Sequence, residues 1–300
     1  MHSGNEIFLQ PFAPVPAIHT LPATFVPGTN TSVLRLDKID AVVSGNKWYK
    51  LRYYLDEAIA TGKGILTWGG AWSNHIIATA AACRRLGIPC AGIIRGEEPE
   101  WPSATLKSAA RAGMSLYYVS RSDYAAKKTP VALSTGNFIH VPEGGAGETG
   151  ARGAATILRD AEATDFTHIF CAVGTGTTLA GLVRGAAPGQ QVIGIAVLKD
   201  YSLENTIRSL LQGQDNWQLL HGYERGGYAK HDRELIGFMN EFFDQANIRT
   251  DFVYTAKMFM AAQALLRATP LPEQSRVLLI HSGGLQGNRG LPIGTRLFGL

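Results

Sequence analysis

A lysine in a turn of small residues is the first feature of this chain that could do chemistry. Lys47 lies in the sequence SGNKWYK at residues 44–50, just as the pattern of an amphipathic helix begins. Gly45 and Asn46 allow a ligand to approach closely, and the aromatic neighbours provide an apolar setting. Burial lowers the pKa of a lysine from about 10.4 and makes its amine nucleophilic. A solvated lysine at a helix start is the commoner alternative, and Lys50, one turn further on, is a rival for the same role.

A loop rich in glycine and threonine could hold a phosphate. It lies between an apolar strand pattern and a helix pattern, and its members are Gly174, Thr175, Gly176, Thr177 and Thr178. Backbone amides and hydroxyls at a helix start bind anions, because the helix N-terminus carries positive partial charge. No lysine follows the loop, so it is not a P-loop, and the next glycine, Gly181, breaks the dinucleotide-binding fingerprint. A plain tight turn between strand and helix is the alternative.

Two polar residues that follow a predicted strand are further candidates. Ser73 and Asn74 stand in the sequence GGAWSNH and open a predicted helix. Either residue is a natural helix N-cap, which is the simpler interpretation. In the functional interpretation, Ser73 acts in proton transfer or contacts a carboxylate, and Asn74 donates a hydrogen bond to a cofactor oxygen. His75 is more often a local hydrogen-bonding residue than a catalyst.

Aromatic and hydroxyl side chains near the C-terminus complete the set. Tyr228 and Tyr254 stand at the starts of predicted elements, where buried tyrosines are mostly packing residues. Thr255 and Ser282 carry hydroxyls at the ends of elements. Either hydroxyl could face a pyridine nitrogen.

Together these residues predict a site for pyridoxal 5′-phosphate (PLP). A reactive lysine and a phosphate cradle are what an enzyme needs to hold this aldehyde cofactor as a Schiff base. In this interpretation Lys47 makes the covalent bond and the loop at 174–178 binds the phosphate. Neither feature would be sufficient alone. The three cysteines show no spacing typical of zinc ligands, so no metal site is predicted.

The elements that must position these residues alternate between short apolar strands and helices. The predicted strands are 33–36, 64–68, 90–94, 115–119, 138–141, 167–173, 191–197 and 276–281. The predicted helices are 46–60, 73–85, 103–112, one from about 148, 177–184, one near 203, 234–243 and 254–266. Such alternation is typical of βαβ units with parallel sheets. The proline-rich residues 1–30 are predicted to be irregular.

The pattern predicts two α/β units. A small inserted domain covers residues 60–144, and a large domain combines residues 1–59 with 145–300. Glycine-rich segments follow several predicted strands, at 69–70, 143–145, 174–176 and 282–284. Ligands in parallel sheets bind at the carboxyl ends of strands, so these segments are predicted to converge on one cleft.

Composition excludes several classes of function. The chain has 300 residues, 17% of them charged, and a net charge of +4 without a basic block. This argues against a nucleic-acid or polybasic membrane partner. The longest apolar runs are too short to span a bilayer, and the N-terminus lacks a signal-peptide pattern. The cysteines, at 83, 90 and 171, are odd in number and predict no disulfide framework. We therefore expect a cytoplasmic protein.

Taken in order, the motifs resemble those of one known family. They are SGNKWYKL, GGAWSNH, VPEGG, VGTGTTLAG, DFVYTAKM and IHSGGLQG, within about residues 33–290. This combination resembles the 1-aminocyclopropane-1-carboxylate (ACC) deaminase/D-cysteine desulfhydrase family, in the tryptophan synthase β-like superfamily of PLP enzymes. The resemblance implies fold type II, with two open twisted, mostly parallel sheets flanked by helices and the cofactor in the cleft between domains. It also implies a homodimer that acts on a small amino acid.

The resemblance also implies residue roles. Lys47 looks like the Schiff-base lysine, and residues 174–178 look like the phosphate loop. Ser73 and Asn74 match the pair near the substrate carboxylate and the cofactor hydroxyl. Two tyrosines flank the substrate in this family, and they match Tyr228 and Tyr254.

One departure from the family pattern bears on the reaction. A strict ACC deaminase pattern has an acid directly after the second tyrosine, where it pairs with the pyridine nitrogen, and this chain has Thr255 there. It also has Ser282 where that pattern has an apolar residue. A carboxylate keeps the pyridine ring protonated and strongly electron-withdrawing, and a neutral hydroxyl does not. The weaker electron sink favours α,β-elimination of a good leaving group, as in D-cysteine desulfhydrases.

Three alternatives to this elimination remain open at the level of sequence. The closest is ACC deamination, which gives 2-oxobutyrate and ammonia. A PLP-binding protein with little catalysis would serve as a carrier or regulator. A nucleotide-binding oxidoreductase would need an acid after its second strand and no essential lysine, and the incomplete glycine fingerprint argues against it.

Overall fold

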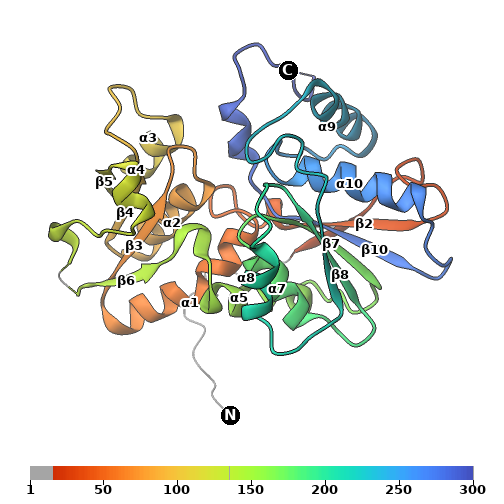
Figure 1. Cartoon of the computed structure of the whole chain (residues 1–300), viewed down its shortest axis with the longest axis horizontal. Coiled ribbons are helices and arrows are strands. Elements are labelled where there is room, and N and C mark those ends of the chain that lie inside the picture. The colour runs from red at the N-terminus through yellow and green to blue at the C-terminus, as the bar shows by residue number, and fades with distance from the viewer. Residues whose placement is uncertain (1–15, 135, 300) are drawn as a thin grey trace.

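The computed structural model describes residues 16–134 and 136–299 and has two lobes, each built around one sheet (Figure 1). Strands between residues 64 and 141 form the smaller sheet, and strands before and after this segment form the larger one. All strand pairs are parallel except one at an edge. The predicted α/β class with two mostly parallel sheets is confirmed.

The smaller sheet has the strand order β5-β4-β3-β6. Its strands are β3 Gly64–Gly69, β4 Cys90–Arg95, β5 Ser115–Val119 and β6 Phe138–Val141. Every residue of β3 is buried. A central parallel strand is covered on both faces, which explains its continuous apolar run.

The larger sheet has the order β1-β2-β10-β7-β8-β9, with β1 antiparallel at one edge. Its strands are β1 Ala17–Thr20, β2 Asn30–Arg35, β7 His168–Val173, β8 Gln191–Ala196, β9 Trp217–Leu220 and β10 Arg276–His281. The carboxyl ends of β7 and β10 lead directly into the loops at 174–176 and 282–284. These two loops therefore open at the same edge of the sheet.

Helix α1, Asn46–Thr61, connects the two lobes. It ends at Gly62, whose φ of 67° is the left-handed conformation that glycine adopts without strain. The fully buried side chains of Leu51 and Leu55 belong to one core cluster together with Ile65 of β3 and Leu34 of β2. Each buried leucine contributes about 1.5–3 kcal/mol. One continuous core therefore joins both sheets on the α1 side.

The remaining helices cover the two sheets. They are α2 Asn74–Leu86, α3 Ala104–Arg111, α4 Arg121–Ala125, α5 Glu148–Ala154, α6 Ile157–Asp160, α7 Thr177–Gly185, α8 Leu203–Ser209, α9 Arg233–Ala246 and α10 Thr255–Ala268. Short 3₁₀ segments include η1 Leu36–Lys38, η2 Val131–Leu133, η3 Glu143–Gly145 and η4 Leu285–Gly290.

The predicted strands and helices are confirmed to within a few residues, but three short elements were missed. These are β1, β9 and α4, each of four or five residues. The prediction that residues 1–30 are irregular is wrong for Ala17–Thr20, because pairing with β2 orders this segment against the sheet edge. Residues 1–15 lie outside the described residues, so the prediction stays open there.

Three further properties of the described residues bear on function. No helix within 16–134 and 136–299 is long and apolar enough to cross a membrane. The same part of the chain contains no group of three or more His, Cys, Asp or Glu residues arranged to hold a metal ion. Cys83, Cys90 and Cys171 are buried free thiols.

Candidate active site

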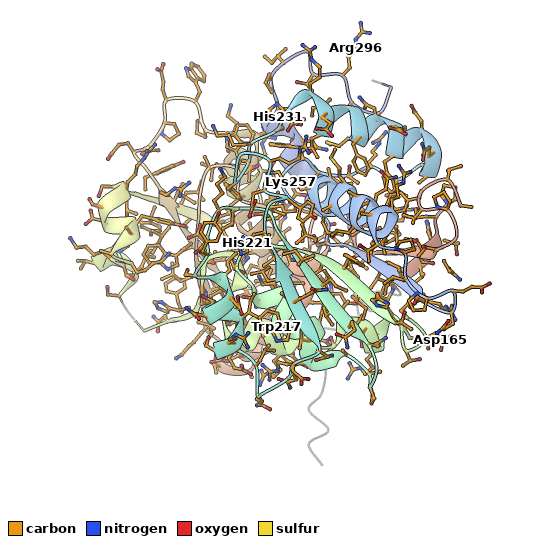
Figure 2. All side chains as sticks on the ribbon, turned by 45° about the vertical axis from the view of Figure 1, so that its right-hand side comes forward. Asp165, Trp217, His221, His231, Lys257 and Arg296 are labelled. Atoms are coloured by element: carbon orange, nitrogen blue, oxygen red, sulfur yellow. The ribbon has the colours of Figure 1, made fainter. Side chains whose placement is uncertain are left out.

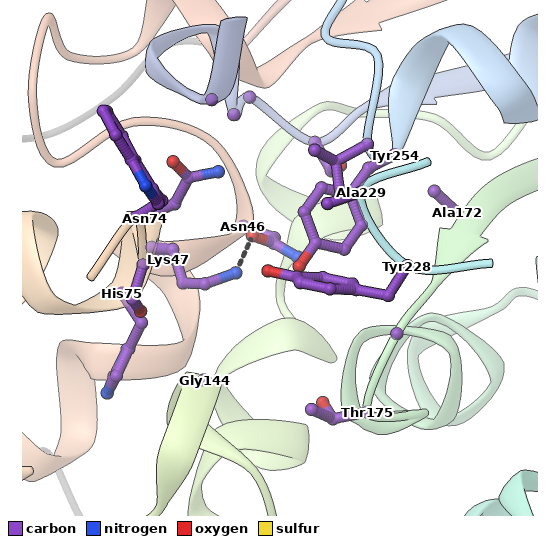
Figure 3. Close-up of a pocket in the computed structure, with 18 of the residues that line it drawn as sticks. Asn46, Lys47, Asn74, His75, Gly144, Ala172, Thr175, Tyr228, Ala229 and Tyr254 are labelled. Carbon is purple, nitrogen blue, oxygen red and sulfur yellow. Dashed lines mark hydrogen bonds between the residues drawn. The ribbon is translucent and has the colours of Figure 1, made fainter. Parts of the chain in front are cut away.

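A cavity of about 620 Å³ lies where the carboxyl ends of strands from both sheets meet (Figure 3). All four glycine-rich segments that were predicted to converge contribute to its wall, through Gly70, Gly144, Gly174 and Ser282 among others. Helices α1 and α2 and the segments around Tyr228 and Tyr254 complete the lining. The predicted convergence on one cleft is confirmed.

Lys47 is on this wall, in the first turn of α1. Its Nζ donates a hydrogen bond to Asn46 Oδ1 at 2.9 Å. Burial of the ammonium group lowers the pKa of Lys47 to about 8, although the charge of Asp251 acts in the opposite direction. A substantial fraction of this lysine is therefore a neutral, nucleophilic amine near physiological pH.

Lys50 lies one helical turn further on, in the same wall. Its side chain is only 2% exposed, and its Nζ lies 3.4 Å from Thr175 Oγ1 in the predicted phosphate loop. Burial, and then the charge of Lys47, lowers the pKa of Lys50 well below its ordinary value. A buried amine without a carboxylate partner would gain strongly from an anion in the cavity.

The loop at 174–178 is held close to Lys47. Asn46 Nδ2 donates to Thr178 Oγ1 at 2.9 Å, so Asn46 bridges the lysine and the loop. Helix α7 starts after Gly176 (φ 76°) without a side-chain cap, which leaves its first amides free to bind an anion. A side chain at Gly176 would clash with Ile207, 2.7 Å from the position of a Cβ.

Four of the five predicted loop residues line the cavity, and Thr177 does not. The Thr177 hydroxyl accepts hydrogen bonds from Gly147 N at 3.3 Å and from Thr175 Oγ1 at 3.2 Å. It therefore orients Thr175 and fixes the start of α5, and the structure gives it no direct place in the wall.

The Ser282 loop packs directly on the Lys47 turn. Asn46 N donates to Ser282 O at 3.1 Å, and a Cβ on Gly45 would lie 1.9 Å from the same oxygen. Only glycine fits here, because Gly45 also has a φ of 68°. Lys47 and Ser282, which are far apart in the sequence, are thereby held in fixed relation.

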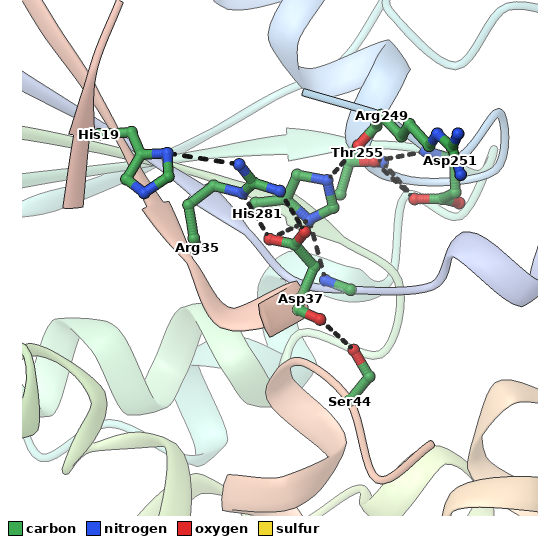
Figure 4. A network of polar contacts seen from close by, with 9 residues as sticks. His19, Arg35, Asp37, Ser44, Arg249, Asp251, Thr255 and His281 are labelled. Carbon is green, nitrogen blue, oxygen red and sulfur yellow. Dashed lines mark hydrogen bonds and ion pairs between the residues drawn. The ribbon is translucent and has the colours of Figure 1, made fainter. Parts of the chain in front are cut away.

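A buried ionic network contacts both the Lys47 turn and the Ser282 loop (Figure 4). Arg35 makes two hydrogen bonds to Asp37, at 2.8 and 2.6 Å, and His281 Nδ1 lies 3.4 Å from the same carboxylate. Burial acts to raise the pKa of Asp37, but Arg35 and His281 hold it below its usual value. Gly283 N donates to His281 Nδ1, and Ser44 Oγ donates to Asp37 O. Both turns are thus tied to one charged cluster.

Thr255 and Ser282, the two predicted partners of a pyridine nitrogen, have different surroundings. Ser282 lines the cavity, whereas Thr255 is fully buried and does not. The Thr255 hydroxyl donates to Asp251 Oδ1 at 2.7 Å and accepts from Asp251 N at 2.8 Å (Figure 4). This hydroxyl is therefore committed to the Asp251 turn at the start of α10.

Ser73 and Asn74 both reach the cavity. Ser73 Oγ accepts from Ile76 N at 3.3 Å, so Ser73 is the N-cap of α2 and also lines the site. Asn74 Oδ1 is buried and has no hydrogen-bond partner among the described residues. His75 Nε2 lies 2.7 Å from Thr67 Oγ1, which makes it a local hydrogen-bonding residue, as expected.

Tyr228 and Tyr254 approach the cavity from the larger lobe (Figure 3). Their ring centroids are 6.1 Å apart, with the planes at 70°. Burial, together with Tyr228, raises the pKa of Tyr254 well above its ordinary value. Its hydroxyl therefore stays protonated and acts as a hydrogen-bond donor. Tyr228 is 52% exposed, which is unusual for a tyrosine beside a cavity.

Sequence reasoning missed two charged residues of the site. Lys50 stands in the sequence analysis only as a rival of Lys47, although its spacing of three residues already places it on the same side of the helix. Asp251 was not considered, although its carboxylate accepts from the backbone amides of Val253, Tyr254 and Thr255. An acid four residues before a helical threonine was the available signal.

A comparison with models of protein families shows to which family of enzymes this chain belongs. Residues 33–283 match the family model described as pyridoxal-phosphate dependent enzyme. The chain belongs to this family. Enzymes of this kind use PLP, so the predicted cofactor and the predicted enzymatic class are both confirmed.

Individual PLP-dependent relatives agree with this placement. A Thermotoga maritima protein provisionally named 1-aminocyclopropane-1-carboxylate deaminase is 31% identical over 87% of this chain and 90% of its own length. A mitochondrial Arabidopsis thaliana protein named bifunctional D-cysteine desulfhydrase/1-aminocyclopropane-1-carboxylate deaminase is 26% identical over 87% of this chain and 73% of its own. A crystal structure described as an ACC deaminase homologue superposes with a TM-score of 0.77 and 25% identity, covering 96% of this chain and 97% of that one.

The residues of the cavity fit PLP. The cofactor needs an amine for its aldehyde, cations and amides for its phosphate, and a donor for its ring oxygen. Lys47 offers the amine, and Lys50 with the uncapped start of α7 offers the anion site. Asn74 lines the cavity, and its Nδ2 is a donor that fits the ring oxygen. Its buried Oδ1, an acceptor, has no partner among the described residues.

Proposed function

We propose that this chain is a PLP-dependent lyase that removes sulfide from D-cysteine by α,β-elimination. One D-cysteine and one water give pyruvate, ammonia and hydrogen sulfide, and the C–S and C–N bonds of the amino acid break. When bound, PLP supplies an electron sink that stabilises negative charge on the substrate α-carbon. The residues of this chain hold the reactants and move the protons.

The observation that carries the proposal is that no acid lines the cavity beside Ser282 within the described part of the chain. Asp251 lies close to the same loop, 3.2 Å from the position of a Cβ on Gly284, but it does not line the cavity. Among the described residues that line the cavity, Glu143 is the only acid, and its Oε2 lies 3.4 Å from Lys127 Nζ, on the exposed side of the wall. A neutral hydroxyl, that of Ser282, is therefore the favoured partner of the pyridine nitrogen. A ring that is not held protonated is a moderate electron sink, sufficient to expel a thiolate.

Lys47 is proposed as both the covalent lysine and the proton carrier. Its pKa of about 8 lets the free Nζ accept or release a proton at the substrate α-carbon near neutral pH. Lys50, Thr175 and Thr178 are proposed to hold the phosphate, with the amides of α7. The 3.4 Å contact between Lys50 Nζ and Thr175 Oγ1 supports these separate roles for the two lysines.

Ser73, Tyr228 and Tyr254 are proposed to orient the substrate. The Ser73 hydroxyl accepts from Ile76 N and can still donate its own proton to a carboxylate. Tyr254 is a donor because its pKa is raised far above neutrality. Asn74 is proposed to donate to the ring oxygen of the cofactor.

ACC deamination is the second candidate, and the names of two relatives favour it. The proteins from Thermotoga maritima and Arabidopsis thaliana both carry this activity in their names. Opening a cyclopropane, which has no good leaving group, demands more of the electron sink than expelling a thiolate does. The hydroxyl of Ser282 therefore favours elimination. A homodimer in the cytoplasm remains part of the proposal.

Product analysis of the PLP-loaded protein tests the proposal. D-cysteine, L-cysteine and ACC are offered in parallel, with the Lys47→Ala variant as the control for reactions of free PLP. We expect sulfide and pyruvate in equal amounts from D-cysteine. Release of 2-oxobutyrate from ACC at a comparable rate contradicts the argument from Ser282, and sulfide from L-cysteine alone contradicts the proposed stereochemistry. No product from any of the three excludes these substrates.

A further inference from the structure

The segment that carries Tyr228 is a turn with unfavourable backbone conformations, held in part by ion pairs of Arg225 with Asp232 and Glu234. We define the Tyr228 loop as residues 221–231, between β9 and α9. Five of its residues have a positive φ, namely Gly222 (94°), Arg225 (47°), Gly226 (87°), Gly227 (111°) and Ala229 (53°). Two of these carry side chains, for which this conformation is unfavourable. Tyr228 itself is half exposed, so apolar burial contributes little to fixing it.

A buried ammonium group lies beneath this loop. Lys257, in the first turn of α10, is 1% exposed, and its Nζ donates to Gly227 O at 2.7 Å and Glu224 O at 2.8 Å. Val197 O, just after β8, lies 3.5 Å away. In Figure 2, Lys257 lies between His221 and His231, the two ends of the loop. Three carbonyl oxygens from two separate segments thus surround one positive charge.

The placement of this charge is not explained by helix stability or ion pairing. A cation in the first turn of a helix opposes the helix dipole. Lys257 forms no ion pair with any acid in the described chain. Burial lowers its pKa to about 8, although the more distant charges of Asp251, Asp232 and Glu224 act to raise it. Burying a charge that has no ion-pair partner costs free energy, and hydrogen bonds to the charge must offset that cost. What they do here is to tie both sides of the strained turn to α10.

The connection reaches both tyrosines of the site. Tyr254 immediately precedes α10, three residues before Lys257, and Tyr228 directly follows the carbonyl of Gly227. We infer that Lys257 is a positioning residue, which acts as a built-in cation that gathers these carbonyls and fixes the Tyr228 ring against Tyr254 over the cavity. The consequence for the reaction rests on the proposed role of Tyr228, but the structural part does not.

Hydrogen exchange of the purified, PLP-loaded protein tests the structural part without any substrate. The amides of Gly227 and Lys230 are bonded to the same carbonyls, Glu224 O and Gly227 O, that Lys257 holds. In Lys257→Ala we expect exchange within the Tyr228 loop to accelerate about 10- to 100-fold, the size expected for lost hydrogen bonds to a charged group. Exchange in β7 and β8 should stay unchanged.

Chemical rescue distinguishes a cation from a mere space-filler. The Ala substitution removes a propylammonium group, so n-propylammonium should restore slow exchange in Lys257→Ala. The neutral n-propanol, of the same size, should not. Lys257→Met fills the space without a charge, and it should show fast loop exchange that n-propylammonium fails to correct. If Lys257→Ala does not fold, Lys257→Gln, which keeps N–H donors but no charge, should show the same local loss.

Several outcomes overturn the inference. Unchanged loop exchange in Lys257→Ala, equal acceleration throughout the larger sheet, or equal rescue by n-propanol would each mean that Lys257 does not act as a local cation. Where a substrate is turned over, Lys257→Ala and Tyr228→Phe should lower kcat by factors that do not multiply in the double variant. If the two kcat factors do multiply in the double variant while the hydrogen-exchange results are as expected, the role of Tyr228 in catalysis is contradicted. The role of Lys257 in the loop is not.

Discussion

At the scale of residues, two lysines one turn apart have different surroundings, and we propose different roles for them. Lys47 Nζ is bonded to Asn46, and Lys50 Nζ contacts the loop at 174–178. The sequence singled out the first lysine and left the second as a rival, and the structure places both on the cavity wall. Spacing indicates that both lie on one side of a helix, and only the fold shows that Lys50 is the one that contacts the loop at 174–178.

The pH dependence of cofactor capture follows from the lowered pKa of Lys47. The neutral amine is the nucleophile, so uptake of PLP by the apoprotein should rise steeply with pH up to about 8 and level off above it. The unfolded chain keeps this proton up to about 10.4, so between these values it binds more protons than the folded chain. The apoprotein therefore gains stability from this group as the pH rises through that window. Stopped-flow absorbance measures the uptake, and a flat profile between pH 6 and pH 9, about the range that spans this pKa, contradicts the prediction.

Substitution of the two hydroxyls separates a cofactor contact from a structural one. Ser282→Ala should lower kcat by about tenfold, the value of one hydrogen bond, with little change in stability. Thr255→Val removes one of the donors to the buried Asp251 carboxylate and the acceptor of Asp251 N, and it should cost about 1–3 kcal/mol in the free energy of unfolding, with kcat largely kept. Denaturant unfolding and steady-state kinetics measure both. If instead Thr255→Val lowers kcat and Ser282→Ala lowers mainly the stability, Thr255 is the partner of the pyridine nitrogen.

At the scale of elements, two glycines at the ends of α1 have nearly the same φ but different neighbours. Gly62 (φ 67°) has no atom within 4 Å of a hypothetical Cβ, whereas that of Gly45 (φ 68°) would meet the backbone of Ser282. Gly62→Ala should cost about 1–2 kcal/mol for its conformation alone. Gly45→Ala should cost about 1–3 kcal/mol more and weaken PLP binding, because the Ser282 loop must move. Equal losses in unfolding free energy and affinity would contradict this packing.

The elements show where sequence patterns suffice. Mostly apolar strands such as β3 and β7 are visible in the sequence because both of their faces are largely buried. Strand β9 was missed since its four residues are only partly buried at the sheet edge. The turn around Asp251 was missed because its bonds are local side-chain contacts that no periodicity reveals. Likewise, the sequence could not choose between Thr255 and Ser282, whose surroundings differ only in three dimensions.

At the scale of the molecule, the cavity lies between lobes that share a core around α1. A shared core predicts that both lobes unfold in one cooperative transition, and that a ligand in the cavity stabilises both. PLP at a hundredfold excess over its Kd should add about 2.7 kcal/mol to the unfolding free energy. Pyridoxal, which lacks the phosphate, should add clearly less.

A matched variant makes this comparison specific to the anion site. In Lys50→Met the difference between PLP and pyridoxal should shrink, because the buried amine beside Thr175, which a bound phosphate would hold protonated, is gone. Thermal unfolding with each ligand measures the effect. Equal stabilisation of the native chain by PLP and pyridoxal would show that residues 174–178 and Lys50 do not hold a phosphate.

The central claim is that Lys47 carries PLP covalently, and borohydride reduction of the PLP-loaded protein tests it most directly. Reduction makes the bond between the cofactor and its amine permanent, so peptide mass mapping then identifies the modified lysine. We predict the label on Lys47, with Lys50 and Lys257 unmodified. Label on Lys50 would exchange the roles of the two lysines in the α1 turn, and label on neither would contradict the account of this site.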